Sequence, residues 1–182
     1  LVIIHAPGRL RDEVGGMERL AEWVVEQRRI ARSFGHEIFL ALGDIQPEYS
    51  AAFKQIGFEA AFNYVTTAAD DLVQPYTVQF DQGGKTAEGT VYEADYENVM
   101  VPSHERHWSA MYEVWGDKGF FPTVTVREDW RHWHPQPRML HYHGCSPSAY
   151  GDMLRRAQAA VARNGGRKFI TVGIWNEFYE DG

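Results

Sequence analysis

The sequence ends with Phe169-Ile-Thr-Val-Gly-Ile-Trp-Asn-Glu-Phe-Tyr-Glu-Asp-Gly182, an apolar run followed at once by polar and aromatic side chains. The apolar part predicts a buried β-strand. Beyond its carboxyl end stand Trp175, Asn176, Glu177, Tyr179 and Glu180. Carboxylates can transfer protons or attack a carbon, and an amide can hold a hydroxyl group. The alternative is a C-terminal strand followed by a solvated acidic tail. The rest of the sequence has to distinguish this alternative from a functional site.

Four further apolar runs predict strands, and helical patterns separate them. The strands are expected at Leu1–Ala6, Ile38–Leu42, Phe58–Tyr64 and Phe120–Val126, the first of them fully buried. Helical periodicity covers Met17–Phe34, with Leu20 and Val24 on its apolar side, and Tyr49–Ile56. It resumes near Tyr92 or His104 and runs to about Trp115. A last helix follows Ser146-Pro147, which reads as an N-cap and a first-turn proline; Met153 and Ala157 belong to its apolar stripe, and Asn164-Gly-Gly166 ends it. Strands that alternate with helices favour a parallel sheet.

Two long stretches lack such a pattern and are expected to be loops. Val65–Glu93 is polar and contains Gln82-Gly-Gly-Lys85, and Arg127–Cys145 is dense in Trp and His. Long loops inside a compact domain are usually functional excursions or mobile segments.

An open doubly wound sheet and a barrel both fit this order of elements. No glycine-rich phosphate loop follows the first strand, which disfavours a nucleotide-binding sheet. Polar residues follow the strand ends, where barrel enzymes keep their chemistry: His5, Asp44, Asn63, Arg127 and Glu177. We therefore expect a parallel (β/α) barrel of the TIM type. A full barrel needs about 250 residues, so residues 1–182 would be its C-terminal five β/α units, a single domain incomplete at the N-terminus.

Composition narrows the choice of partners. The formal net charge is −7, with 18 Lys and Arg against 25 Asp and Glu, which disfavours nucleic acid and anionic membranes. No apolar run approaches the roughly 20 residues that span a bilayer. The single cysteine, Cys145, excludes a disulfide within the chain. Neutral ligands fit best, whereas localisation and oligomeric state stay open.

Several motifs in order resemble a known family. They are Phe121-Pro-Thr-Val124, Trp130, Pro137-Arg138, His143-Gly-Cys-Ser-Pro147 with Tyr150 and Leu154, and Ile174-Trp-Asn-Glu177 with Glu180. These motifs look like the C-terminal half of the WbsX-type domain, which is similar to glycoside hydrolase family 99 and more loosely to family 71. Upstream, Gly57-Phe-Glu-Ala-Ala61 and Ile4–Pro7 resemble further stretches of the same domain.

The resemblance implies a (β/α)8 barrel that acts on glycans, with Asn176, Glu177 and Glu180 on its closing strand. This chain departs from the family pattern at Trp130-Arg-His132, at Asn63-Tyr64 and where Phe178-Tyr179 follows the closing motif. The domain is also labelled a glycosyltransferase in polysaccharide gene clusters, which keeps synthesis open as an alternative.

Candidate site residues follow from these patterns. Glycoside hydrolysis needs an acid and a second carboxylate, and we assign these catalytic roles to Glu177 and Glu180. The candidate residues for binding substrate are His5, Asp44, Asn63, Trp130, His143, Trp175, Asn176 and Tyr179. For Asp44 a turn-capping role is the alternative, and for His5 that of a core histidine.

The histidine-rich stretch allows a different chemistry. His132 and His134, and then His141 and His143, form two His-x-His pairs that could share a strand face and bind zinc. Their spacing matches no established metal motif, so we expect no metal and no cofactor. We interpret these histidines with Trp130, Trp133 and Tyr142 as a sugar-binding wall, and ordinary packing of the loop is an equal alternative.

The sequence thus predicts a glycoside hydrolase that cleaves a neutral oligosaccharide or polysaccharide. A non-catalytic glycan-binding or polysaccharide-assembly domain is the first alternative, and a metal-dependent hydrolase the second.

Overall fold

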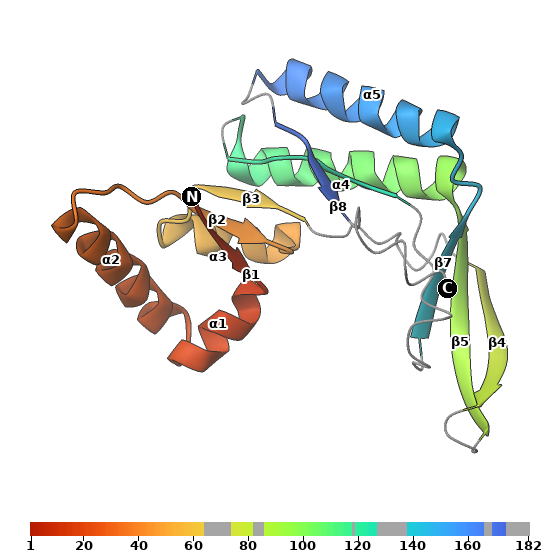
Figure 1. Ribbon diagram of the computed structural model, residues 1–182, viewed down its shortest axis with the longest axis horizontal. Helices are drawn as coiled ribbons and strands as arrows, with labels where there is room; N and C mark the ends of the chain where they lie inside the picture. The colour runs from red at the N-terminus through yellow and green to blue at the C-terminus, as the bar shows by residue number, and fades with distance from the viewer. Residues whose placement is uncertain (64–73, 82–85, 118, 127–137, 166–168, 174–182) are drawn as a thin grey trace.

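The computed structural model describes residues 1–63, 74–81, 86–117, 119–126, 138–165 and 169–173, which form a mixed α/β structure (Figure 1). In chain order the elements are β1 (Val2–His5), α1 (Pro7–Val14), α2 (Met17–Ser33), β2 (Leu40–Gly43), α3 (Pro47–Gln55), β3 (Ala60–Phe62), β4 (Gln74–Asp81), β5 (Thr86–Asp95), the π-helical turn η2 (Tyr96–Met100), α4 (Val101–Trp115), β6 (Thr123–Thr125), β7 (Arg138–His143), α5 (Pro147–Asn164) and β8 (Thr171–Gly173).

The first three strands form a parallel sheet in the order β1-β2-β3, with helices in the connections. All four residues of β2, Leu40–Gly43, are buried, as expected for the central strand of a parallel sheet covered on both faces. The predicted parallel pairing of these strands is therefore confirmed.

A second parallel pair is formed by β6 and β8, with Val124 opposite Val172. One bridge between Ala61 and Phe120 links this pair to β3. The Ala61 N–H donates to the Gly119 carbonyl at 2.7 Å, and the Phe121 N–H donates to the Ala61 carbonyl at 3.0 Å.

The predicted TIM-type barrel is wrong. The described strands form one three-stranded sheet of β1-β2-β3, another of β4-β5-β7 and a two-stranded sheet of β6-β8, and none of the three closes on itself. Closure requires enough strands with a consistent stagger, typically eight. Here β1 pairs only with β2 and β8 only with β6 among the described residues, so the outer edges of these two strands do not meet.

The two predicted loops contain regular structure, which is a further correction. Strands β4 and β5 form an antiparallel hairpin within Val65–Glu93 and just beyond, and β7 lies within Arg127–Cys145 and pairs parallel with β5. Figure 1 shows this sheet projecting away from the rest of the molecule, beyond the end of α4.

Helices α4 and α5 lie side by side and pack on the strands (Figure 1). Trp108, Met111 and Trp115 of α4 are buried at spacings of three and four residues, and Met153 and Ala157 of α5 repeat this spacing. These side chains belong to one continuous hydrophobic core that also contains Leu40 and Leu42 of β2.

The start of α5 agrees with its prediction. Ser146 is the N-cap, its hydroxyl oxygen accepts a hydrogen bond from the Ala149 N–H at 3.1 Å, and Pro147 occupies the first turn. The helix ends before Gly165, which has φ of 67°, the left-handed conformation that glycine adopts without strain.

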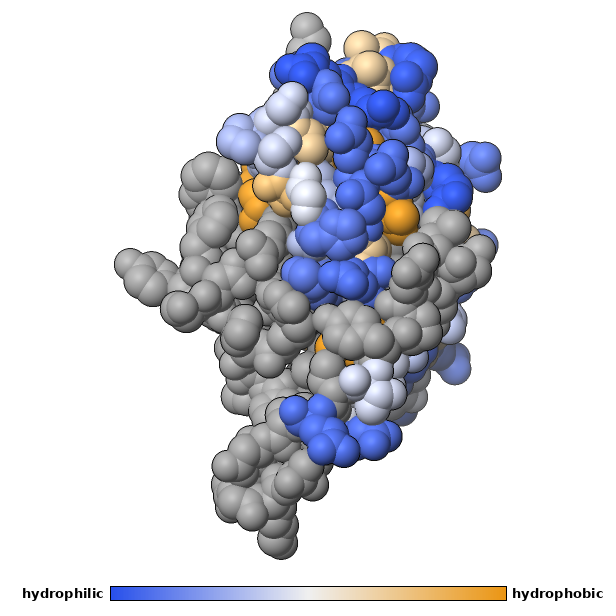
Figure 2. All heavy atoms as spheres, turned by 90° about the vertical axis from the view of Figure 1, so that its right-hand side faces the viewer, coloured by the Kyte–Doolittle hydropathy of each residue, from blue (hydrophilic) through white to orange (hydrophobic). Residues whose placement is uncertain are grey.

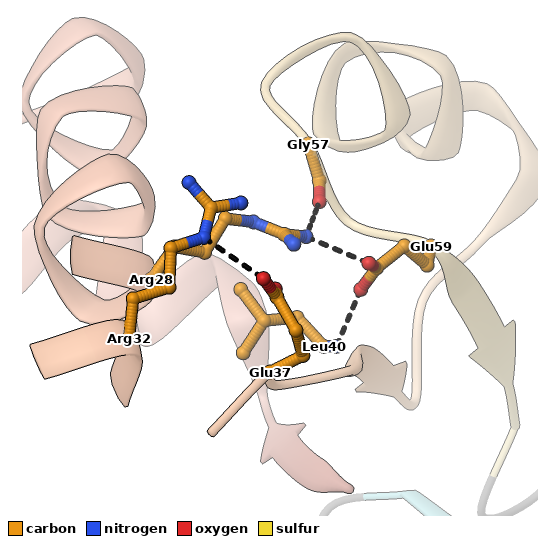
Figure 3. A network of polar contacts seen from close by, with 6 residues as sticks. All are labelled: Arg28, Arg32, Glu37, Leu40, Gly57 and Glu59. Atoms are coloured by element: carbon orange, nitrogen blue, oxygen red, sulfur yellow. Dashed lines mark hydrogen bonds and ion pairs between the residues drawn. The ribbon is translucent and has the colours of Figure 1, made fainter. Parts of the chain in front are cut away.

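A polar network fastens α2 to the amino ends of β2 and β3 (Figure 3). Arg28 donates to the Gly57 carbonyl at 2.7 Å and forms an ion pair with Glu59 at 2.9 Å. The other carboxylate oxygen of Glu59 accepts from the Leu40 N–H at 2.6 Å. Glu59 therefore satisfies a buried backbone donor and holds the helix at the same time.

Burial at the N-terminal end differs from the prediction. β1 is an edge strand of its sheet and is not fully buried. Val2 is 39% and Ile3 50% exposed. In α2, Leu20 and Val24 are buried as predicted, but Phe34 at the end of the apolar stripe is 75% exposed.

Candidate functional site at the strand ends

The carboxyl ends of β1, β2 and β3 lie side by side and collect three of the predicted site residues. His5 stands opposite Gly43, and Gly43 opposite Phe62, in the parallel register. Asp44 and Asn63 are the next residues along β2 and β3. The Asp44 N–H donates to the Phe62 carbonyl at 2.9 Å, so the pairing continues past β2. The structure thus brings His5, Asp44 and Asn63 to one edge of the sheet, here called the strand-end site.

Asn63 is the residue of this site whose environment is hardest to explain by structure alone. It is 1% exposed, and neither Oδ1 nor Nδ2 of its side chain has a hydrogen-bond partner among the described residues. A buried polar group left unsatisfied costs about 1–3 kcal/mol. Such groups are rare in native proteins and call for a specific explanation.

The backbone of Asn63 is firmly held although its side chain is not. The Thr123 hydroxyl of β6 donates to the Asn63 carbonyl. The same hydroxyl lies 2.5 Å from the hydroxyl of Thr171 in β8. Because three strands are joined at this point, the amide of Asn63 is presented from a rigid support.

Asp44 and His5 form the exposed part of the strand-end site. Asp44 has φ of 60°, a left-handed conformation that aspartate tolerates better than most residues. A Cβ on Gly43 would lie 3.3 Å from the Phe62 ring and 3.7 Å from the His5 ring, so glycine lets both rings approach the strand. His5 is exposed, which excludes the alternative of a core histidine.

A satisfied polar network lies behind β6. His104 of α4 is completely buried, with Nδ1 3.0 Å from the Met100 carbonyl oxygen and Nε2 3.0 Å from the Thr125 hydroxyl. A carbonyl only accepts, so Nδ1 carries the proton and Nε2 accepts from Thr125. Burial lowers the pKa of His104 to about 4, and the imidazole is therefore neutral at neutral pH.

Tyr96 ties the end of β6 to η2. Its hydroxyl donates to the Thr125 carbonyl at 2.5 Å and lies 3.3 Å from the Met153 sulfur. Burial raises the pKa of Tyr96 above its usual value, so the hydroxyl stays protonated as a donor. Both Tyr96 and His104 therefore hold β6 in place.

His143, another predicted binding residue, lies on β7 in the projecting sheet. His141 and His143 stand opposite Glu93 and Asp95 of β5 in register. The His141 Nδ1 is 3.0 Å from the Glu93 carboxylate, and the His143 Nδ1 is 3.6 Å from that of Asp95. A cavity of about 350 Å³ adjoins them, lined by His141, His143, Gly144, Cys145 and Ser146. The sequence reasoning missed Glu93 and Asp95, because only the pairing of β5 with β7 brings them here.

A second cavity, of about 500 Å³, lies in the groove between α4 and α5. Trp108 and Tyr112 contribute to it, with Glu105, Glu113 and Arg163 among the charged residues around it. The sequence reasoning did not single out this groove. Its α4 residues recur at helical spacing, a pattern that predicts packing as readily as binding.

The remaining predicted site residues lie outside the described residues. They are the catalytic candidates Glu177 and Glu180 and the binding candidates Trp130, Trp175, Asn176 and Tyr179. The same holds for His132 and His134 of the possible zinc site. Within the part of the chain that the structure describes, no group of three or more His, Cys, Asp or Glu side chains is arranged to hold a metal ion.

The fold defines an α/β protein with small sheets, and comparison with known proteins adds no closer assignment. No family model, curated protein or solved structure matches the chain. None of the described helices has the length and apolar character needed to cross a membrane.

Proposed function

We propose that this protein is carbohydrate-active: it binds a neutral glycan at the strand-end site and cleaves it with carboxylate chemistry. The observation that carries the proposal is the buried amide of Asn63, whose donor and acceptor atoms have no partner among the described residues. A hydroxyl group donates and accepts at once, so neighbouring sugar hydroxyls match both amide atoms.

The neighbours of Asn63 favour the same class of ligand. Asp44 accepts hydrogen bonds, and the imidazole of His5 can accept or donate one. Both are exposed at the edge where Asn63 is buried, so a ligand could contact the two of them from solvent. The net charge of −7 disfavours polyanionic ligands.

The bond-cleaving role is assigned to Glu177 and Glu180 from the sequence and the family resemblance. One carboxyl group protonates the leaving oxygen, and the other acts as nucleophile or as base for water. Their separation would set the outcome, because about 5 Å gives retention and about 6.5–9.5 Å gives inversion.

The test uses the full chain and a panel of neutral oligosaccharides and polysaccharides, with binding followed by calorimetry and cleavage by release of reducing ends. Glu177→Gln should reduce turnover at least about 100-fold and leave the dissociation constant within about threefold, because only proton transfer is lost. The matched control is Glu22→Gln, on the exposed surface of α2. Failure of the unmutated protein to bind any neutral glycan would refute the proposal.

Two other outcomes identify the alternatives. Binding that survives Glu177→Gln, with no turnover by the unmutated protein, would indicate a non-catalytic glycan-binding or assembly domain. Cleavage that stops on chelation and returns with zinc would indicate the metal-dependent hydrolase.

A further inference from the structure

The cavity where β7 meets α5 has the features of a second ligand site. His143 of β7 is among the residues that line it. Figure 1 shows β7 apart from the β1-β2-β3 sheet. Its volume of about 350 Å³ falls within the range of small-molecule sites. On the face of the molecule that Figure 2 shows, the described surface is mainly hydrophilic, with small separate apolar patches.

Asp95 is held beside His143 by its bonds to Asn98. One of its carboxylate oxygens accepts from the Asn98 N–H at 2.7 Å and from the Asn98 side-chain amide at 2.8 Å. The other oxygen is the one that lies 3.6 Å from Nδ1 of His143. This distance is longer than a hydrogen bond, so the carboxylate acts on His143 as a neighbouring negative charge.

This arrangement determines which imidazole nitrogen is left for a ligand. Nδ1 is the ring nitrogen of His143 that lies nearest Asp95, so Nε2 is the nitrogen left to face a ligand. The side chain is 48% exposed, and the residue lines the cavity. His143 can therefore accept a hydrogen bond from a ligand hydroxyl.

Gly144 and Ser146 complete the arrangement. Gly144 has φ of 76°, and a Cβ there would lie 3.0 Å from the Asp95 oxygen that faces His143, so a larger residue would crowd the carboxylate. The Ser146 oxygen accepts from the Ala149 N–H, and its own proton remains to be donated. The cavity thus offers an acceptor in His143 and a donor in Ser146.

We propose that this cavity is a second subsite for one neutral sugar unit, whose hydroxyl groups donate to Nε2 of His143 and accept from Ser146. The choice of ligand class rests on the proposed function. Because the strand-end site is separate, the absence of binding at one site does not exclude binding at the other.

The test follows imidazole nitrogen shifts by NMR in the full chain during titration with methyl α-D-glucopyranoside, methyl α-D-mannopyranoside and methyl β-D-galactopyranoside. The Asn63→Leu variant serves as background, because it removes the amide of the strand-end site. With at least one probe, the Nε2 signal of His143 should move saturably. Measured by calorimetry with the same probe, His143→Gln and Asp95→Asn should weaken that binding by roughly 2- to 10-fold, the effect of one lost hydrogen bond or one lost neighbouring charge. His36→Gln, an exposed histidine elsewhere, is the matched control.

The outcomes separate the two proposals. Glycan binding that disappears in Asn63→Leu, with no response of His143, overturns the second subsite and leaves the strand-end site standing. A saturable His143 response that is equal with and without Asn63 supports the second subsite even if the strand-end site binds nothing. Absence of any response to all three sugars overturns the second subsite. Because Gln and Asn preserve polarity at partly exposed positions, circular dichroism of these variants should match the unmutated protein.

Discussion

Two buried polar side chains, Asn63 at the strand-end site and His104 on α4, have opposite environments. His104 has a partner for each ring nitrogen, whereas neither amide atom of Asn63 has one among the described residues. Both residues lie next to β6, since His104 bonds Thr125 and the Asn63 carbonyl accepts from Thr123.

The difference separates a region with a structural explanation from the region for which we propose binding. A buried polar group that is fully paired fixes its neighbours and contributes to stability. One that is buried and unpaired costs stability unless something else completes it. The network around His104 therefore has a structural explanation, whereas the described residues provide none for the amide of Asn63. The following predictions test this contrast in order of expected effect.

Acid should produce the largest effect, through His104 and His107 of α4. Burial lowers the pKa of each to about 4, whereas an unfolded histidine titrates near 6.5. Between these values the unfolded chain binds protons that the folded chain does not, so stability is full above about pH 6.5 and falls as the pH drops towards 4. Each histidine should account for about 3 kcal/mol of loss by pH 4.

Urea unfolding at several pH values between about 7 and 4 measures this loss. His107→Gln should remove roughly half of the pH-dependent loss of stability. Equal stability at both ends of the range would show that these histidines are not neutral and buried.

His104→Leu should have the next largest effect. The change replaces the imidazole with an apolar side chain of similar size and leaves the buried Thr125 hydroxyl without its acceptor. It also removes the edge-on contact with Trp108, whose ring centroid lies 5.8 Å away. We expect a loss of about 3 kcal/mol in the free energy of unfolding, measured by urea titration at neutral pH. A loss of less than 1 kcal/mol would show that the hydrogen bonds of His104 contribute little to stability, and the contrast with Asn63 would then not hold.

Asn63→Leu should act in the opposite direction. The substitution removes two polar atoms that have no partner among the described residues, and it keeps the number of side-chain heavy atoms and the backbone carbonyl that accepts from Thr123. We expect stability to rise by about 1–2 kcal/mol, or a few degrees in Tm, and glycan binding at the strand-end site to be lost. Asn63→Asp, which keeps the acceptor, serves as the comparison for binding. If Leu destabilises the free protein, the amide is satisfied in solution and the site loses its main support.

Ser146→Ala should have the smallest effect of the four. The Ser146 hydroxyl caps α5 through the Ala149 N–H, and loss of such a cap costs about 1 kcal/mol. Thermal unfolding measures the change. Ser148→Ala is the control, because Ser148 is exposed and lies two residues after the cap. Equal Tm values for the two variants would contradict the capping role.

The sequence could predict the elements whose signals are local. The cap at Ser146, the apolar spacing of Met153 and Ala157, and the glycine after the helix predicted α5 correctly. The hairpin was missed although its signal was present: positions 76, 78 and 80 are apolar, and they pair with 91, 89 and 87 across the glycines of 82–85. Alternating apolar residues are the pattern of a strand. The polar residues between them led to the interpretation of this stretch as a loop.

The strand-end site was also predicted in part. His5, Asp44 and Asn63 follow three strands, and parallel pairing in sequence order places them together. His143 was selected from its motif, but its partner Asp95 lies 48 residues earlier and could not be found without the register of β5 and β7. The roles of Glu177 and Glu180 remain predictions.

The sequence by itself determined α2, α3 and α5, the parallel pairing of β1, β2 and β3, and the polar residues that stand at the ends of these strands. These features depend on contacts within a few residues or between consecutive β-α-β units. Only the tertiary structure decided that the described sheets stay open, that β5 pairs with β7, and that the amide of Asn63 has no partner among the described residues while His104 is satisfied. Those features depend on pairings between distant segments, for which hydrophobic periodicity contains no information.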